Sequence, residues 1–186
     1  FLPMVAAPAA VAMVWRWLYN SEFGLLNHML KSIGLGPVNW ISNPDIALIS
    51  VAIVGIWSVI GYNMVLFLAG LQEIPGDYYE AAEIDGAGPV RQFFSITIPL
   101  ISPTMFFVTT TRVIAAMQVF DVIYMMIDRT NPALSRTQSL VYLFYKYSFI
   151  ESNQGYGSAI VVLLLLIIMV LTVIQNVMQK KWVNYN

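Results

Sequence analysis

Cysteine is absent from this sequence, and histidine and charge are scarce. With no cysteine among 186 residues, disulfides, thiolate catalysis and zinc–thiolate sites are excluded. The single histidine, His28, argues against a histidine-based metal site, so we expect no metal and no other cofactor. A net charge of −1 argues against nucleic-acid binding, which needs a basic surface.

Charged residues make up only 10% of the chain, whereas 59% are hydrophobic and the mean hydropathy is +0.71. Soluble domains carry about 25% charged residues. Most side chains here must therefore face lipid or other apolar side chains. The chain begins with Phe1 inside an apolar run, without Met and without the basic start of a signal peptide. We expect a membrane protein whose N-terminal part is missing from this sequence.

Four stretches are long and apolar enough to cross a bilayer, which takes about 20 residues. They are 1–19, 45–71, 103–127 and 157–178. Asn43-Pro44-Asp45 opens the second with a cap residue, a proline and an acid, and Ser102-Pro103 opens the third in the same way. The sequence thus predicts an all-α, polytopic transmembrane helical bundle, with residues 1–186 as a single domain.

The loops between these spans are 20–44, 72–102 and 128–156, and a tail follows from Gln179. Four spans place 72–102 and the tail on one side of the membrane. Cytoplasmic loops usually carry an excess of Lys and Arg. Three basic residues on that side face four on the other: Arg91, Lys180 and Lys181 against Lys31, Arg129, Arg136 and Lys146. The charge count therefore does not orient the chain.

The second loop contains a short helix that is marked at both ends. Asp77 and Glu80 have the spacing of a capping box, and Gly86 is placed as a C-terminal stop. A helix of about two turns is marginal alone in water. Ala81 and Ala82 offer a flat face that would let a partner approach closely. The alternative is a solvated acidic linker, since five acids lie here: Glu73, Asp77, Glu80, Glu83 and Asp85.

The remainder of this loop reads as an amphipathic stretch at the membrane surface. Its apolar residues are Val90, Phe93, Phe94, Ile96 and Ile98. Because proline cannot donate a backbone hydrogen bond, Pro99 and Pro103 are expected to break the chain before it re-enters the bilayer.

The spacing within this loop resembles a known family motif. Glu80-Ala81-Ala82 is followed by three residues, Gly86, nine residues and Ile96-Thr97-Ile98-Pro99. This pattern is similar to the EAA motif of the inner-membrane subunits of binding-protein-dependent ABC importers, and only Ile98 departs, from the usual Leu. Further sequences resemble the carbohydrate and glycerol-3-phosphate type: FLP at 1–3, Trp15-Arg16-Trp17, Gly24-Leu25-Leu26-Asn27, Phe120-Asp121-x-Ile123-Tyr124, Thr137-x-x-Leu140, Tyr145-x-x-x-Phe149 and Gly155-Tyr156-Gly157-Ser158-Ala159.

The resemblance implies a type I permease core in the inner membrane, with partners. In this family the EAA helix is cytoplasmic and binds a groove of an ATPase dimer. That orientation places 72–102 and the C-terminus inside, and 20–44 and 128–156 outside. A second permease subunit and an extracytoplasmic solute-binding protein are implied as well. One departure is 128–132, where many relatives have a T-x-GGP turn near the docking face for the binding protein.

The same resemblance bears on the number of spans, on ATP hydrolysis and on the residues that couple the chain to an ATPase. Relatives usually have six spans in this core, which fits two missing N-terminal spans. The chain has no G-x-x-x-x-G-K-[ST] sequence, so ATP hydrolysis is expected in another subunit and the chain itself is not expected to be an enzyme. The implied ATPase-coupling residues are Asp77, Glu80, Ala81, Ala82, Asp85, Gly86, Ile96 and Pro99.

Polar residues within the predicted spans are the candidates for a solute pathway, because ionisable groups there usually face the bundle interior. The candidates are Trp57, Tyr62, Asn63, Arg112, Gln118 and Asp121. On one continuous helix Gln118 and Asp121 would share a face, which Met125 continues, and Arg112 would lie opposite Asp121. Solute contact and structural pairing both stay open for each. Gly55, Ser58 and Gly61 are expected to let another helix approach.

Three classes of function compete. The first is a permease subunit of an ATP-driven importer for a sugar, or for a polyol such as glycerol 3-phosphate, whose anionic group would suit Arg112. The second is an ion channel or ion-coupled carrier built on Arg112 and Asp121, but it leaves the EAA-like loop unexplained and the sequence shows no inverted repeat. The third is a membrane enzyme, which has little support because this sequence has no cysteine and no convergent carboxylates within the spans.

Overall fold

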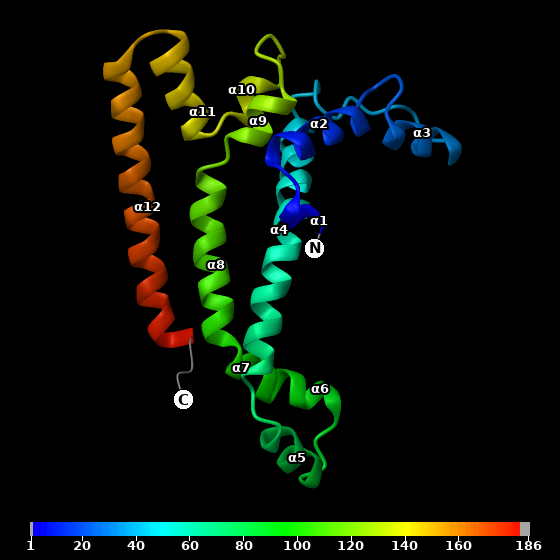
Figure 1. Ribbon diagram of the computed structural model, residues 1–186, viewed down its shortest axis with the longest axis vertical. Helices are drawn as coiled ribbons and strands as arrows, with labels where there is room; N and C mark the ends of the chain where they lie inside the picture. Colours follow the sequence, from blue (N-terminus) through cyan, green and yellow to red (C-terminus); the bar gives the residue numbers. More distant parts are fainter. Residues whose placement is uncertain (1, 183–186) are drawn as a thin grey trace. The chain divides into compact units, whose positions relative to one another are not determined.

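The computed structural model describes residues 2–182, which form helices joined by turns (Figure 1). Phe1 and 183–186 lie outside the described residues, and with them the C-terminus that we expect in the cytoplasm. No β-strand occurs between residues 2 and 182, so the all-α prediction is confirmed. The helices are α1 Leu2–Val5, α2 Pro8–Leu18, α3 Leu25–Ser32, α4 Ala47–Gln72, α5 Asp77–Ile84, α6 Pro89–Gln92, η1 Phe93–Thr97, α7 Ile98–Leu100, α8 Ser102–Met117, α9 Asp121–Met126, α10 Leu134–Thr137, α11 Leu140–Tyr145, η2 Lys146–Ile150 and α12 Gln154–Trp182.

The chain divides into two compact units. Unit 1 comprises Phe1–Gly61 and Met117–Leu164, and unit 2 comprises Tyr62–Ala116 and Leu165–Asn186. The division falls within α4 and within α12, so each of these long helices contributes to both units.

Two helices of the described chain are long and apolar enough to cross a membrane by themselves. They are α4, with 26 residues, and Gln154–Lys180 of α12, with 27. The predicted spans 45–71 and 157–178 are therefore confirmed to within a few residues. Only 17% and 11% of their most apolar windows are buried within the described chain, as expected for helices that lipid or other subunits cover.

The predicted first span over 1–19 is wrong for the described residues. Helix α1 has four residues and α2 has eleven, and neither reaches the length that a bilayer requires. Pro8 is the physical reason. Its missing N–H and fixed φ suit the start of a helix rather than its interior, and the preceding Ala7 is extended at φ −62° and ψ 132°.

The predicted third span over 103–127 is also interrupted. Helix α8 ends at Met117, and α9 begins only at Asp121. The Ser139 hydroxyl donates to the Val119 carbonyl at 2.5 Å, and Phe120 leaves the helical region at φ −133°. The shared face expected for Gln118, Asp121 and Met125 is therefore wrong, because no continuous helix joins these residues.

The remaining part of that span belongs to a bent pair. The segment Pro89–Leu100 and helix α8 together are long and apolar enough for a third crossing, with a bend of 63° between them. Pro99 lies just before the bend, and the Ser102 hydroxyl donates to the Pro99 carbonyl at 2.7 Å. The break predicted from Pro99 and Pro103 is confirmed.

Unit 1 is built around the packing of α2 against α9. Its buried cluster comprises Val11, Ala12, Tyr19, Val51, Val54, Ile123, Met126, Ile127, Leu134 and Tyr142. The buried Tyr19 hydroxyl donates to the Ser50 carbonyl at 3.1 Å, and burial raises the pKa of Tyr19 to about 12. Two ion pairs tie distant segments to this core, Arg16 with Asp128 at 2.5 Å and Arg136 with Asp45.

In unit 2, α4 and α8 approach each other closely at Gly70. A Cβ atom added there would lie 2.5 Å from Oγ1 of Thr104.

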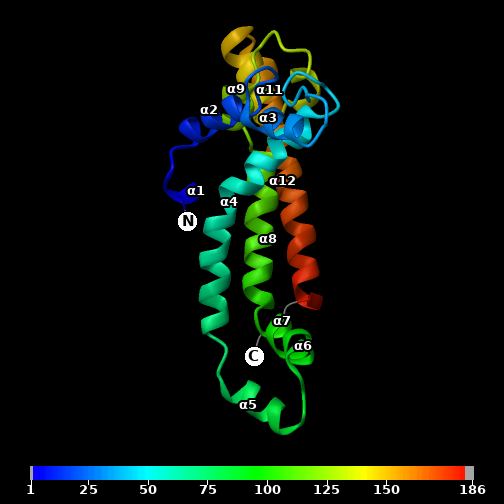
Figure 2. The same cartoon turned by 90° about the vertical axis from the view of Figure 1, so that its right-hand side faces the viewer.

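The predicted close approach at Gly55 is wrong within the described chain, since nothing lies within 4 Å of a Cβ added there. Ser58 instead donates to the Val54 carbonyl of its own helix at 2.8 Å. Figure 2 shows α5 at the tip of the loop that joins the end of α4 to α6 and α7.

Candidate coupling loop and solute pathway

Helix α5 begins one residue earlier than the capping box predicts. Gly76 is the N-cap residue, and its carbonyl accepts from the Tyr79 N–H at 2.8 Å and the Glu80 N–H at 3.1 Å. No side chain caps this end, so the predicted capping box is wrong. Because Gly76 is already helical at φ −60° and ψ −30°, Asp77 and Glu80 lie within the first turn. Their charges there stabilise the positive end of the helix dipole.

The C-terminal stop of α5 is confirmed. Gly86 has φ +74°, the left-handed conformation that glycine adopts without a steric penalty. The Gly86 N–H donates to the Glu83 carbonyl at 3.0 Å, and the Ala87 N–H donates to the Ala82 carbonyl at 2.8 Å. These two bonds form a complete Schellman motif, which satisfies carbonyls that would otherwise be orphaned at the helix end.

The surface of α5 is uncovered. None of its eight residues is buried, and the Ile84 side chain is 87% exposed. One side-chain contact connects α5 to the next segment, because the Tyr79 and Thr97 hydroxyls lie 2.9 Å apart. An isolated two-turn helix with exposed Ala81 and Ile84 gains little from its own packing, so its shape suits a surface that another protein covers.

The segment after α5 is helical throughout, from α6 through the π-helical η1 to α7. Val90, Phe93 and Phe94 are exposed on it, as the predicted amphipathic stretch requires. Ile96 and Pro99, the end of the EAA-like pattern, are half-buried. Through this segment α5 is connected to α8 within unit 2.

Arg112 on α8 contacts Tyr62 on α4. The guanidinium carbon lies 5.2 Å from the centre of the Tyr62 ring, a cation–π arrangement. Four buried side-chain atoms of unit 2 have no hydrogen-bond partner among the described residues: Asn63 Oδ1, Thr110 Oγ1, Arg112 Nε and Gln175 Oε1. By contrast, the neighbouring Thr111 bonds back to the Phe107 and Val108 carbonyls of its own helix.

The other three pathway candidates belong to unit 1. Trp57 packs edge-on against Trp15, with ring centres 5.8 Å apart, and borders the buried cluster. Gln118 is exposed in the interruption after α8, and Asp121 is the exposed first residue of α9. Of the six candidates, the structure thus brings Tyr62 and Arg112 into direct contact and gives Trp57 a packing role.

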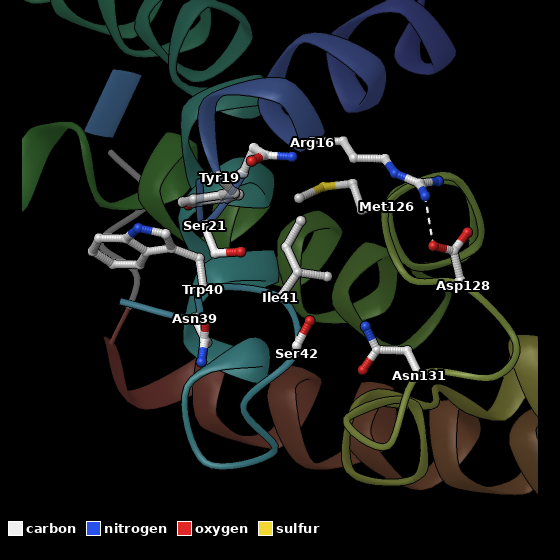
Figure 3. Close-up of a pocket in the computed structure, with 11 residues that line it drawn as sticks. Arg16, Tyr19, Ser21, Asn39, Trp40, Ile41, Ser42, Met126, Asp128 and Asn131 are labelled. Carbon is white, nitrogen blue, oxygen red and sulfur yellow. Dashed lines mark hydrogen bonds and ion pairs between the residues drawn. The ribbon is translucent and has the colours of Figure 1, made fainter. Parts of the chain in front are cut away.

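A polar pocket in unit 1 was not predicted from the sequence (Figure 3). Its volume is about 150 Å³, and Tyr19, Trp40, Asn131 and the Arg16–Asp128 ion pair line it. The lining comes from 16–21, 39–42 and 126–131, which lie far apart in the sequence. Asp128 and Asn131 belong to the turn that departs from the usual T-x-GGP sequence. That departure was the one feature of the sequence that could have indicated this pocket.

Comparison with known proteins identifies the family. The model for the "Binding-protein-dependent transport system inner membrane component" family matches residues 1–184. The chain is 39% identical over 178 residues to the sn-glycerol-3-phosphate transport system permease protein UgpA of Yersinia enterocolitica, covering 94% of this chain and 58% of that protein. It is 33% identical over 174 residues to the sulfoquinovosyl glycerol transport system permease protein SmoG of Agrobacterium fabrum, covering 93% and 56%.

A third relative is the trehalose/maltose transport system permease protein MalF of Thermococcus litoralis, which is 35% identical over 173 residues, covering 93% of this chain and 58% of that protein. The chain thus spans a little over half the length of these curated relatives. The crystal structure of a bacterial ABC transporter involved in the import of the acidic polysaccharide alginate has the same fold, with a TM-score of 0.88 at 22% identity over 97% of this chain and 63% of that chain. The chain therefore belongs to the family of binding-protein-dependent transport system inner membrane components.

Proposed function

We propose that this chain is the core of a permease subunit of an ATP-driven importer for a sugar or a related polyol. The observation that carries the proposal is the loop at 72–102. It presents an uncovered eight-residue helix, closed by Gly86, between apolar helices. Relatives are named for glycerol 3-phosphate, sulfoquinovosyl glycerol, xylose/arabinose and trehalose/maltose. These names support a sugar or polyol as the solute class.

The proposed assembly has three further components. An ATP-binding subunit dimer hydrolyses ATP, a second permease subunit completes the membrane core, and an extracytoplasmic binding protein delivers the solute. A periplasmic protein loaded with an alginate pentasaccharide is bound in one structure of the alginate transporter, which supports a binding-protein partner. The subunit lies in the inner membrane, with the loop at 72–102 and the C-terminus in the cytoplasm.

The mechanism follows from the connections within unit 2. When ATP closes the ATPase dimer, α5 moves with the groove that holds it. The Schellman motif at Gly86 keeps the end of α5 fixed, and the Tyr79–Thr97 contact connects α5 to η1. Displacement then passes through Ile96 and Pro99 into α8, which carries Arg112. Tyr62 and Asn63 on α4 lie in the same unit and border the proposed solute pathway.

Two substitutions test the coupling role of α5. Gly86→Pro is incompatible with φ +74° and removes the N–H that donates to Glu83, whereas Glu80→Lys reverses a charge on the exposed face. In proteoliposomes that hold the complete importer, both variants should insert normally. Loaded binding protein should stimulate their ATPase activity roughly tenfold less than that of the wild type, which corresponds to a loss of about 1.4 kcal/mol.

Matched controls lie in the same loop. Glu73→Lys reverses an exposed charge outside α5, and Gly76→Ala adds a Cβ atom in open space at φ −60°. Both controls should couple normally. Wild-type stimulation and uptake in Gly86→Pro and Glu80→Lys would show that α5 does not transmit force.

A further inference from the structure

Helix α3 presents an apolar face that the described chain leaves uncovered. Leu25, Met29 and Ile33, the C-cap residue, are 45%, 57% and 70% exposed. At about 100° per residue these three side chains lie within about 80° of one another. Phe23 before the helix and Leu35 after it are exposed as well. Exposed apolar residues that gather on one face, rather than occurring singly, mark an interaction surface.

The other two sides of α3 differ from this face. Asn27 is fully buried, and Leu26 and Leu30 beside it are half-buried, so this side is attached to unit 1. His28 and Lys31 are exposed on the remaining side, and α3 contains no acidic residue. An apolar face next to a polar side that carries basic residues is typical of a helix in the membrane interface, where headgroup phosphates lie.

Hydrogen bonds hold α3 at one end of a membrane span. The Trp40 indole N–H donates to Asn27 Oδ1 at 2.9 Å, and the Ser50 hydroxyl donates to the Trp40 carbonyl at 2.8 Å. Ser50 is the fourth residue of α4, so these two bonds connect α3 to the first turn of that helix. Figure 1 and Figure 2 both show α3 running across the direction of α4, level with its N-terminal end.

The length of α4 shows where this level lies in a bilayer. Its 26 residues extend about 39 Å at about 1.5 Å per residue, whereas the hydrocarbon core is about 30 Å thick. With the span centred, each end reaches about 4–5 Å beyond the core, into the headgroup region. Leu48 and Ile49 in the first turn are exposed, as lipid contact requires. A helix that crosses α4 at this level runs along the membrane surface.

We infer that α3 is an interfacial helix whose apolar face, formed by Leu25, Met29 and Ile33, is covered by membrane lipid. Its polar side, with His28 and Lys31, faces the headgroups and water. Through Asn27 the helix then anchors the loop between α2 and α4 to the membrane surface. The inference needs only the membrane location of the family, so it is independent of the solute and of ATPase coupling.

The test measures what surrounds a fluorescent label on each side of α3. The full-length permease subunit, with the subunits that accompany it, is reconstituted in phospholipid nanodiscs. Because this chain has no cysteine, Met29→Cys places a single environment-sensitive label on the apolar face. The matched control is Lys31→Cys, since Lys31 is exposed on the opposite side of the helix. Native cysteines of accompanying subunits are replaced beforehand.

Lipids that carry a nitroxide near the headgroup should quench the label of Met29→Cys at least about twofold more strongly than that of Lys31→Cys. Iodide in the buffer should show the reverse order. Leu25→Cys, one turn earlier on the same face, should repeat the result for Met29→Cys. This second position keeps the test decisive if one variant does not fold.

Two outcomes would overturn the inference. Labels on the apolar face could be open to iodide and untouched by the nitroxide lipids, which would place α3 in water. They could instead be shielded from both quenchers, which would show that a protein surface covers this face. ATPase stimulation in the same preparation reports on the proposed function separately, so either result can fail without the other.

Discussion

At the scale of single residues, Asn27 organises the loop between α2 and α4. Its side chain is fully buried, and all of its hydrogen-bonding groups are used. Nδ2 donates to the Ser21 carbonyl at 3.1 Å and the Val38 carbonyl at 2.9 Å. Oδ1 accepts from the Val38 N–H at 3.0 Å and the Trp40 indole N–H at 2.9 Å. One side chain of α3 thereby fixes the chain at Val38 and Trp40, in the segment between α3 and α4 that has no regular structure.

Asn27→Leu should therefore destabilise unit 1. Leucine has a similar volume but leaves the backbone groups of Val38 and the Trp40 indole without partners, at a cost of about 2–4 kcal/mol. Thermal unfolding of the purified subunit in detergent, followed by tryptophan fluorescence, measures the effect. His28→Leu is the control, since His28 is the next residue on α3 and is exposed. Equal midpoints for the two variants would contradict the role of Asn27.

The sequence analysis recognised Asn27 only as part of a short sequence that resembles relatives. Its partners Val38 and Trp40 follow 11 and 13 residues later, in a segment without helical or strand periodicity. Local pattern therefore could not predict the contacts. Arg112 is a different case, because a basic residue within a long apolar run is visible in the sequence. Its contact with Tyr62 depends on how α4 and α8 pack, and the sequence alone does not show this.

At the scale of elements, local signals predicted the end of α5 and the break near Pro99, but they missed the start of α5 and two interruptions of the predicted spans. Gly86 was predicted to end α5 because a left-handed glycine after a short helix is a local requirement. Gly34 at φ +81° ends α3 in the same way, although the sequence analysis did not single it out. The interruption after Met117 was missed because a bond from Ser139, 20 residues away, takes the Val119 carbonyl. The start of a new helix at Pro8 was missed because the residues on both sides of it are apolar and read as one continuous span.

The packing of α4 on α8 gives a prediction at this scale. Gly70→Val should destabilise the complex by about 1–3 kcal/mol, because its Cβ would lie 2.5 Å from Thr104 Oγ1 and 3.1 Å from Thr104 Cβ. Gly55→Val, in the same helix, adds the same side chain where nothing lies within 4 Å. Thermal unfolding of the two variants in the same detergent compares them. Greater destabilisation by Gly55→Val would show that the critical contact of α4 lies elsewhere.

At the scale of the whole molecule, composition and long apolar runs predicted the class and two spans correctly. These features depend on many residues at once, so local errors do not affect them. The candidate sites divide in the same way. The EAA-like loop was predicted because its spacing is local in the sequence, whereas the pocket in unit 1 was not, since its lining is drawn from three distant segments.

The bend of 63° between Pro89–Leu100 and α8 has a geometric consequence. If the segment at 89–100 is displaced along its own axis, the component along α8 is proportional to the cosine of 63°, a little under half of the displacement. The component across α8 is proportional to the sine and is about twice as large. In the proposed mechanism, a push from an ATPase subunit would therefore move the N-terminal end of α8 sideways more than along the helix axis. The bend therefore turns the larger part of such a displacement into a tilt of α8, which would change the direction in which Arg112 faces more than its depth.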